Sequence, residues 1–445
     1  MTIGKGEGQM AFASDETSES LRLFETHPLR EAVLGEVHAR PFRPLTPARV
    51  VMHYAFLTNA EQADADRKWF AEYCGSQGAP GPAADARYHA LEFAGGTLNW
   101  ERHTEFITYT WDGPATEDSP FSKLPANHPF GAAFRAPGPM LVATRLDLLS
   151  AKAGDTWRSH YDAASLTAFH VENGGALAAT DFRPDGNGHT RFLLVNESMN
   201  PVQSGAVVQR LLEIETYRSL ALLGLFEANR LQPEISGIEA ALVELTQSMQ
   251  DTTGLDANRS LLEHLSKLAA TLEAGAAAST YRFGASRAYY DIVMARLKAL
   301  NEEPIAGDLS MSAFLSRRLG PAMRTCHSTE ERQAMLSRKL ARATTLLRTR
   351  VDVDLEQQNR SLLESMNRRA RLQLRLQQTV EGLSVAAISY YVVGLVAYLA
   401  KGAKELGAPI GSAGLVTGAS VPVVLLVIWW TLRRIRAHHS EKGDD

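Results

Sequence analysis

The residues whose types and spacing could do chemistry are concentrated in WERHTEF, at positions 100–106. On an extended strand, Glu101, His103 and Glu105 project from one face, because successive side chains alternate. Two carboxylates and an imidazole on one face could hold a divalent cation, or they could accept a proton. A solvated sheet face explains the same pattern, and it is the interpretation we favour.

A second polar cluster lies in HPLREAVLGEVHARPF, at positions 27–42, and consists of His27, Arg30, Glu36, His38 and Arg40. The spacing of the apolar residues in this segment predicts a helix. Residues two apart, such as Glu36 and His38, do not share a helix face. Salt bridges and capping therefore explain this cluster better than a local metal site does.

The third cluster is Asn196 and Glu197, just before Asn200 and Pro201. Asn200 followed by Pro201 is typical of a helix start, so capping is the simplest role for the cluster. All three clusters remain candidate binding sites for a ligand, because loops at the ends of a sheet often bind ligands.

The usual catalytic motifs are missing from the sequence. It has no phosphate-binding glycine loop with a Lys-Ser or Lys-Thr ending, no Gly-x-Ser-x-Gly, no His-Glu-x-x-His and no Cys-x-x-Cys. We therefore predict no catalytic residues, no enzyme activity, no resident metal and no cofactor. A divalent cation is the one ligand that the polar clusters leave open.

The composition excludes several classes of protein. The chain has 445 residues, of which 45% are hydrophobic and 22% are charged, a balance typical of globular proteins. A formal net charge of −4 gives no basic surface for nucleic acid, so no nucleic-acid partner is expected. Two cysteines, Cys74 and Cys326, cannot form a disulfide framework and are typical of a reducing compartment.

The chain up to residue 197 predicts an α+β fold. Residues 1–25 lack the apolar core of a signal peptide and are expected to be a flexible tail. The segment 26–197 predicts a cytosolic domain with a mixed or antiparallel sheet, because glycine-rich turns separate its strands. A helix is expected at 60–74, and strands are expected at 50–58, 87–93, 97–101, 103–111, 139–147, 166–171, 176–183 and 190–196.

Beyond residue 197 the pattern is helical. A helical domain is expected at 198–327, with helices at 201–231, 234–250, 257–301 and 309–319. A long stalk helix is expected at 328–382, because Ser328-Thr329-Glu330-Glu331 is a capping-box pattern and neither proline nor glycine follows for some 50 residues. Its apolar residues recur at steps of three, four and seven, which is typical of a coiled coil and favours a homo-oligomer.

The C-terminal part predicts a transmembrane hairpin at 383–432. Residues 383–400 and 411–432 carry no charge, and each stretch is long enough to cross a bilayer. Arginines precede the first stretch and follow the second, so the positive-inside rule puts both chain ends, including the tail 433–445, in the cytoplasm of a bacterium. The expected location is the inner membrane, with the lipid bilayer as a partner.

The first predicted span carries a stripe of polar residues. Gln377, Ser384, Tyr391 and Tyr398 are seven apart and therefore lie on one helix face. The stripe could line a pore or face another subunit, or its tyrosines could be anchors at the membrane surface. In the second span, Gly411, Gly414 and Gly418 have the spacing that lets helices pack closely.

Four segments of the chain resemble a bacterial family of membrane-anchored proteins with a domain of unknown function. They are HPLREAVLGEVHARPF, WERHTEF, RFLLVNESMNP and EGLSVAAISYYVVGL, and the resemblance extends over about residues 20–436. It implies an inner-membrane protein and no known activity. The overall plan also looks distantly like the CorA-type divalent-cation transporters, although the Gly-Met-Asn of that family is replaced by AYLAKG at 397–402.

Three functions are compatible with these observations. The first is an oligomeric protein anchored in the inner membrane, whose cytosolic domain binds a ligand or partner for sensing or as a scaffold. The second is a CorA-like ion channel or transporter, with the first span lining the pore. The third is a membrane-tethered enzyme that uses Glu101, His103 and Glu105. We favour the first, because neither catalytic nor selectivity motifs are present.

Overall fold

The computed structural model describes residues 25–31, 33–34, 43–151, 155–405 and 412–440. The described residues up to Glu244, together with Ser266–Ala341, form one compact unit. Leu245–Leu265 and the residues from Arg342 onward form a second.

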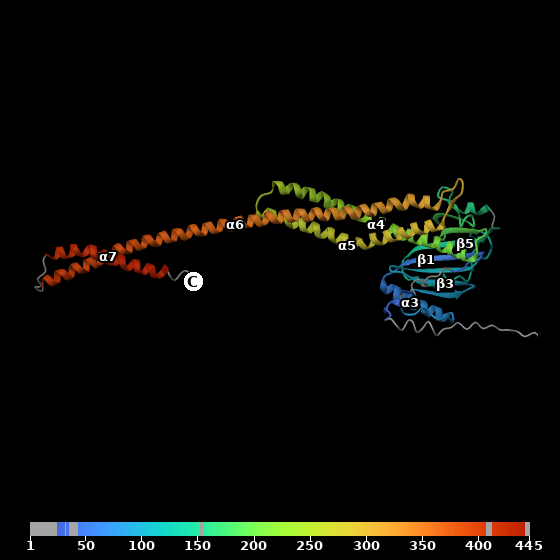
Figure 1. Cartoon of the computed structure of the whole chain (residues 1–445), viewed down its shortest axis with the longest axis horizontal. Coiled ribbons are helices and arrows are strands. Elements are labelled where there is room, and N and C mark those ends of the chain that lie inside the picture. The colour runs from blue at the N-terminus through green and yellow to red at the C-terminus, as the bar shows by residue number, and fades with distance from the viewer. Residues whose placement is uncertain (1–24, 32, 35–42, 152–154, 406–411, 441–445) are drawn as a thin grey trace, which may run out of the picture. The chain divides into compact units, whose positions relative to one another are not determined.

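A nine-stranded mixed sheet, in the order β2-β3-β4-β1-β5-β8-β7-β6-β9, organises the first unit (Figure 1). In the described part of the chain, neighbouring strands pair antiparallel except β5 with β8, which confirms the predicted mixed sheet. The strands are β1 (Arg49–Leu57), β2 (Tyr88–Phe93), β3 (Gly96–Arg102), β4 (Phe106–Pro114), β5 (Met140–Ser150), β6 (Thr167–Val171), β7 (Ala176–Pro184), β8 (Thr190–Asn196) and β9 (Glu303–Pro304).

The predicted strands agree with the structure to within a few residues, with two exceptions. The strand predicted at 103–111 begins only at Phe106, because residues 103–105 form the turn from β3, where the His103 amide donates to the Phe106 carbonyl. The short β9 was not predicted, because two residues carry no periodic signal. A short 3-10 helix, η3 (Asp155–His160), also lies between β5 and β6.

Helix α3 (Ala60–Ser76) covers one face of the sheet. A capping box between Asn59 and Gln62 starts it, and its apolar residues pack on the aromatic side chains of β3 and β4. Within this core, Asp66 accepts hydrogen bonds from Trp100 Nε1 at 2.8 Å and from the Tyr109 hydroxyl at 3.0 Å. Burial raises the pKa of Asp66 to about 6, although both donors favour its charged form.

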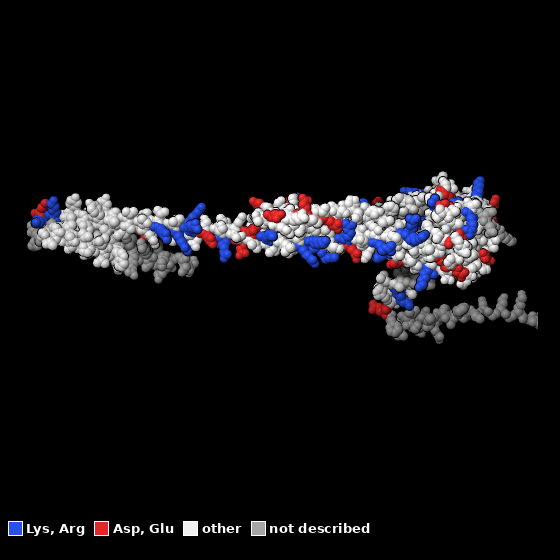
Figure 2. Space-filling view, turned by 90° about the horizontal axis from the view of Figure 1, so that it is seen from above, with Lys and Arg blue, Asp and Glu red and all other residues white. Residues whose placement is uncertain are grey.

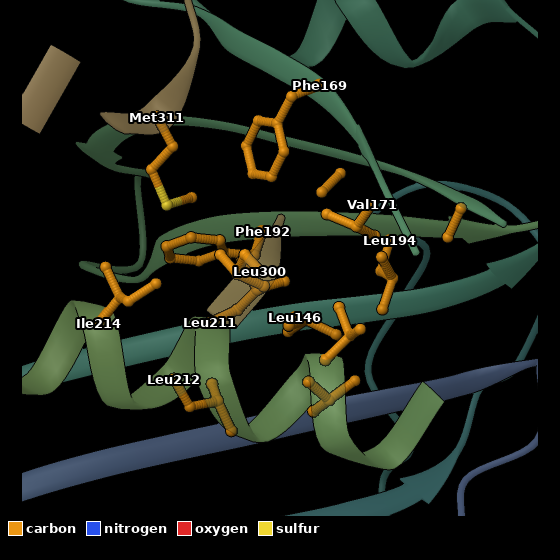
Figure 3. Packing of buried hydrophobic residues seen from close by; sticks show 14 of the residues in the cluster. Leu146, Phe169, Val171, Phe192, Leu194, Leu211, Leu212, Ile214, Leu300 and Met311 are labelled. Atoms are coloured by element: carbon orange, nitrogen blue, oxygen red, sulfur yellow. The ribbon is translucent and has the colours of Figure 1, made fainter. Parts of the chain in front are cut away.

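Helices α4 (Pro201–Asp251) and α5 (Leu255–Leu300) cover the opposite face of the sheet, together with the start of α6. Figure 3 shows this core: side chains from β5, β6 and β8 meet Leu211, Leu212 and Ile214 of α4, Leu300 of α5, and Met311. As predicted, Asn200 caps α4, because its Oδ1 accepts from the Gln203 amide at 2.9 Å.

Two helices continue where prolines were expected to end them. Helix α4 includes Pro233, and α6 (Met311–Glu405) includes Pro321, so the helix start predicted at Ser328 is wrong. An interior proline costs a helix about 3 kcal/mol. Residues on both sides of each proline are buried, and their packing offsets this cost: Leu231 and Ile235 around Pro233, Leu319 and Ala322 around Pro321. Helix α6 starts instead at Met311, whose amide donates to Glu302 Oε2 at 3.0 Å.

The second unit consists of the α4–α5 turn, most of α6, and α7 (Ala413–Ser440). Both α6 and α7 are long and apolar enough to cross a membrane. Only 11% and 6% of their apolar windows are buried, which separates them from core helices of soluble proteins. In Figure 1, α7 doubles back along the end of α6, and Figure 2 shows few charged side chains on the described surface of this hairpin except at its tip.

A close backbone contact fixes the start of α4 against the segment before β1. The Leu45 amide donates to the Pro201 carbonyl at 2.8 Å, and a Cβ added to Gly205 would lie 1.8 Å from the Arg43 carbonyl oxygen. Only glycine fits there without moving one of the two segments.

We predict that Gly205→Ala destabilises the protein by about 1–3 kcal/mol, the usual cost of overpacking. Gly237→Ala, in the same helix, is the control: its Cβ would meet nothing within 4 Å. Because alanine favours helices over glycine by up to about 1 kcal/mol, this change should stabilise. Urea unfolding of the two variants would measure both effects, and equal effects would contradict the role of the close contact.

Candidate functional site

A cavity of about 120 Å³ lies between α4 and the sheet face formed by β1, β3 and β4. The floor consists of cross-strand rows, in which Thr108 pairs with Glu101 and Ala55, and Thr110 pairs with Asn99 and His53. The wall consists of α4 residues at helical spacing, from Gly205 to Tyr217. The cavity has a mixed lining: aliphatic side chains such as Val208 and Leu212 alternate with polar ones.

The alternation of side chains along β4 explains why the sheet side of the cavity is polar. Its odd-numbered residues, Ile107, Tyr109 and Trp111, pack under α3 in the aromatic core. Its even-numbered residues, Thr108, Thr110 and Asp112, therefore point to the opposite face, under α4.

His53 holds the sheet to α4 through both ring nitrogens. The Thr216 hydroxyl donates to the Leu212 carbonyl at 2.9 Å, so it must accept from His53 Nε2, 2.8 Å away. His53 Nδ1 is then the acceptor for the Thr110 hydroxyl, at 2.7 Å. Burial lowers the pKa of His53 to about 4, so the ring is neutral at pH 7 and acts as a fully bonded structural group.

A network of charges closes one end of the cavity. Asp112 is buried and forms ion pairs with Arg49 at 3.1 Å and with Arg43 at 3.8 Å, while Arg43 also contacts Glu92 at 3.2 Å. Burial raises the pKa of Asp112 to about 6 despite the two arginines. Arg43 Nη1 is buried, and no described group accepts a hydrogen bond from it.

The residues of the WERHTEF cluster separate in the structure. Glu101 and His103 line the cavity, with 3.6 Å between Glu101 Oε2 and His103 Nε2, and the His103 ring stacks on Phe106 at 4.0 Å. Glu105 turns toward α5, where Arg282 donates to it through two nitrogens and the Tyr289 hydroxyl donates at 2.8 Å. The expected single strand face is therefore wrong, because β3 ends at Arg102.

The other two clusters lie elsewhere. His27 and Arg30 are exposed, and the His27 ring accepts from the Leu29 amide at 3.1 Å, while Glu36, His38 and Arg40 lie outside the described residues. Asn196 has a structural role: its side chain accepts from the Met199 amide at 2.8 Å and donates to the Met199 carbonyl at 3.0 Å. The Glu197 amide donates to the Gly175 carbonyl at the turn between β6 and β7.

No described part of the chain covers the polar stripe of the first predicted span. Gln377, Ser384, Tyr391 and Tyr398 are all exposed on α6. A Cβ added to Gly414 or Gly418 would meet nothing within 4 Å, so these glycines take no part in the contact between α6 and α7, and Gly411 lies outside the described residues.

Metal ligands do not converge anywhere in the described part of the chain. No group of three or more His, Cys, Asp or Glu side chains there could hold a metal ion. The WERHTEF cluster forms no such group because Glu105 lies apart from Glu101 and His103.

Comparisons with known proteins identify the family. A family model described as "Protein of unknown function (DUF3422)" matches residues 25–439. The chain belongs to the DUF3422 family. This match confirms the family with a domain of unknown function that the four segments predicted. A comparison with curated proteins gives no significant match.

Among solved structures, that of the full-length CmaX protein matches 78% of the DUF3422 chain and 96% of its own, with 14% sequence identity. The TM-score is 0.15, so this match carries no evidence of a shared fold. The distant likeness to CorA-type transporters is not shown by any of these comparisons.

Several cavity residues of this DUF3422 protein are polar residues within apolar strands, a pattern that does not by itself indicate a cavity. His53 interrupts the apolar strand VVMHYAFL, and Thr108, Thr110 and Asp112 alternate with large apolar residues. Alternation of this kind is equally typical of an exposed sheet face, but here both faces are covered. The cavity could be found only by knowing that α4 crosses this face.

Acid should destabilise the protein through His53. Between pH 6.5, where a free histidine titrates, and about pH 4, the unfolded chain binds a proton that the folded chain does not, so stability falls as the pH falls. From pH 7 to pH 5 this loss should be about 2 kcal/mol.

The test is urea unfolding of the wild type and His53→Gln at both pH values, followed by tryptophan fluorescence. Asp66 and Asp112 titrate in both proteins, so the difference between the two pH dependences isolates His53. Parallel pH dependences would contradict the assignment of a buried neutral imidazole.

Proposed function

We propose that this DUF3422 protein is a membrane-anchored binding protein, which uses the cavity under α4 to sense a small polar molecule. The observation that carries the proposal is the cavity itself: a pocket of about 120 Å³ with a mixed polar and aliphatic lining, between α4 and the sheet. A cavity of about 150 Å³ can hold benzene, so this one suits a molecule of a few heavy atoms.

The charges around the cavity favour a small zwitterion such as an amino acid. Three carboxylates line it, on Glu101, Asp112 and Glu213. Asp112 is paired with Arg49 and Arg43, and Glu213 is paired with Arg296. A ligand ammonium group would be attracted by the carboxylates, and the aromatic side chains of Tyr88, Phe106 and Tyr217 also line the cavity. The buried Arg43 Nη1 would donate to a ligand carboxylate, which supplies the missing hydrogen-bond acceptor.

Helices α6 and α7 would hold this binding unit at the inner membrane of a bacterium. Exposed arginines at 368, 369, 371 and 375 precede the apolar part of α6, and each would gain about 1 kcal/mol near anionic head groups. The positive-inside rule then favours a cytoplasmic binding unit, with the tip between α6 and α7 outside.

Ligand binding can be tested with alanine as the probe. We expect alanine to raise the melting temperature of the full-length protein in nanodiscs, since a ligand at 100 times its Kd stabilises by about 2.7 kcal/mol. Ethylamine, which lacks the carboxylate, should bind more weakly.

Glu101→Gln should abolish the response to alanine, because it removes a cavity carboxylate and preserves the shape of the side chain. Glu72→Gln is the matched control: Glu72 is exposed on α3, and its replacement should leave the response unchanged. If alanine and related zwitterions leave the wild type unaffected, or if both variants respond equally, the proposed use of the cavity is wrong.

Membrane topology has a separate test. In intact cells, a membrane-impermeant maleimide should label Lys404→Cys, at the exposed tip of α6, and should label Arg375→Cys only after permeabilisation. The native cysteines are buried and give little background. Labelling of Arg375→Cys alone would reverse the orientation, and recovery of the protein in the soluble fraction would exclude the anchor.

A further inference from the structure

One stretch of α6 lacks the tertiary contacts that surround the helices of the first unit. Just before it, Leu347 and Val351 are buried, and Asn258 of α5 donates to Asp354 at 2.8 Å. From Glu356 to Val380 every residue is exposed, and nothing in the described part of the chain covers them.

One face of this exposed stretch carries only apolar and amide side chains, and we call this face the seam. At about 100° per residue, its members fall within a narrow sector of the helix. Three are strongly exposed aliphatic residues: Leu362 at 61%, Met366 at 66% and Val380 at 57%. The seam consists of Leu355, Asn359, Leu362, Met366, Ala370, Gln373, Gln377 and Val380, and continues through Ser384, Tyr391 and Tyr398.

The face of α6 opposite the seam has a different composition. Arg360, Arg368 and Arg375 are each two positions from a seam residue, about 200° around the helix. Farther along, the buried Ser389 and Ala400 mark the face that α7 covers, and each is two positions from a seam tyrosine. The intramolecular partner of α6 therefore lies on one side, and the seam is left open on the other.

We infer that the seam is the interface with the α6 of a second copy of this chain, in a parallel arrangement. The inference rests on the membrane anchoring proposed above and is independent of ligand binding. Anchoring gives every copy the same orientation and the same depth in the membrane. Each seam residue of one copy can therefore contact the same residue of a second copy. Parallel pairing of a stripe with steps of three, four and seven is the geometry of a coiled coil.

The polar residues of the seam suit this occupant better than they suit lipid or a solvated surface. A single Asn or Gln at a core position pairs with its counterpart and fixes the register of a parallel coiled coil, as Asn359 and Gln373 would. In the membrane, Tyr391 has 70% of its surface exposed, and a hydroxyl group in hydrocarbon is costly without a partner. A second copy would bring the hydrogen-bonding groups of its own seam to this face.

Cysteine cross-linking in native membranes tests the interface. We expect Leu362→Cys and Met366→Cys to form disulfides under mild oxidation and to give a species of twice the 48.7-kDa mass. Glu364→Cys is the matched control, since it is exposed between them but lies on the opposite face. Because a disulfide needs Cα atoms within about 7 Å, cross-linking at the seam should be on the order of tenfold faster than at the control.

Several outcomes would overturn the inference. The first is that neither seam position cross-links in membrane-bound protein. The second is that position 364 cross-links as fast as the seam positions, and the third is that the cross-linked partner has another mass. All three positions are exposed, so the substitutions leave the core intact. If the protein is missing from the membrane fraction, the anchoring has failed, and cross-linking of the solubilised full chain then decides whether the seam pairs without it.

Discussion

Both faces of the sheet are covered by helices or loops. This constraint determines which side chains each strand can have, because residues on both of its faces are buried. A strand covered on one face can leave alternate residues in water, but β1 and β4 carry buried residues on both faces: aromatic and aliphatic ones under α3, and polar ones such as His53, Thr108 and Asp112 under α4. On the face under α3, large aromatic side chains fill the space, and one buried carboxylate, Asp66, is bonded by Trp100 and Tyr109. On the face under α4, threonines, His53 and Asp112 must find partners within the protein.

Some of these polar groups have hydrogen-bond partners and others do not. His53 is bonded at both nitrogens, and Asp112 has two arginines. Two buried polar atoms on the same sheet face, Arg43 Nη1 and Thr144 Oγ1, have no hydrogen-bond partner among the described residues. Thr144 pairs in register with His53 but does not line the cavity, whereas Arg43 does. Buried polar groups are normally bonded, so the unpaired Arg43 Nη1 is the one that supports the proposed ligand.

The fold could be predicted from the sequence to the extent that its signals are local. Alternation of apolar residues located the strands of the sheet, and the glycine turns indicated the hairpins, as at Gly95, which has a φ of 74°. Prolines 233 and 321 misled the prediction, because tertiary packing on both sides of them outweighs the local preference. The site is non-local: His53 and Thr110 meet through the β1–β4 register, and Thr216 reaches them only after α4 crosses the sheet. Of the predicted site residues that the structure describes, Glu101 and His103 alone lie in the cavity, because a turn after Arg102 diverts Glu105 to α5.

Most helices of a globular protein bury apolar side chains, but the exposed part of α6 is helical without burying any. The segment 356–380 is rich in Leu, Arg, Gln and Glu, which are strong helix formers, and it extends a helix already nucleated in the first unit. It can therefore remain helical without a partner. The aliphatic side chains of the seam add little to this, since a pair four apart on a solvated helix, such as Leu362 and Met366, stabilises it by only about 0.2–0.5 kcal/mol. Their alignment with Ser384, Tyr391 and Tyr398, on the side that α7 leaves open, is the feature on which the inferred association with a second copy rests.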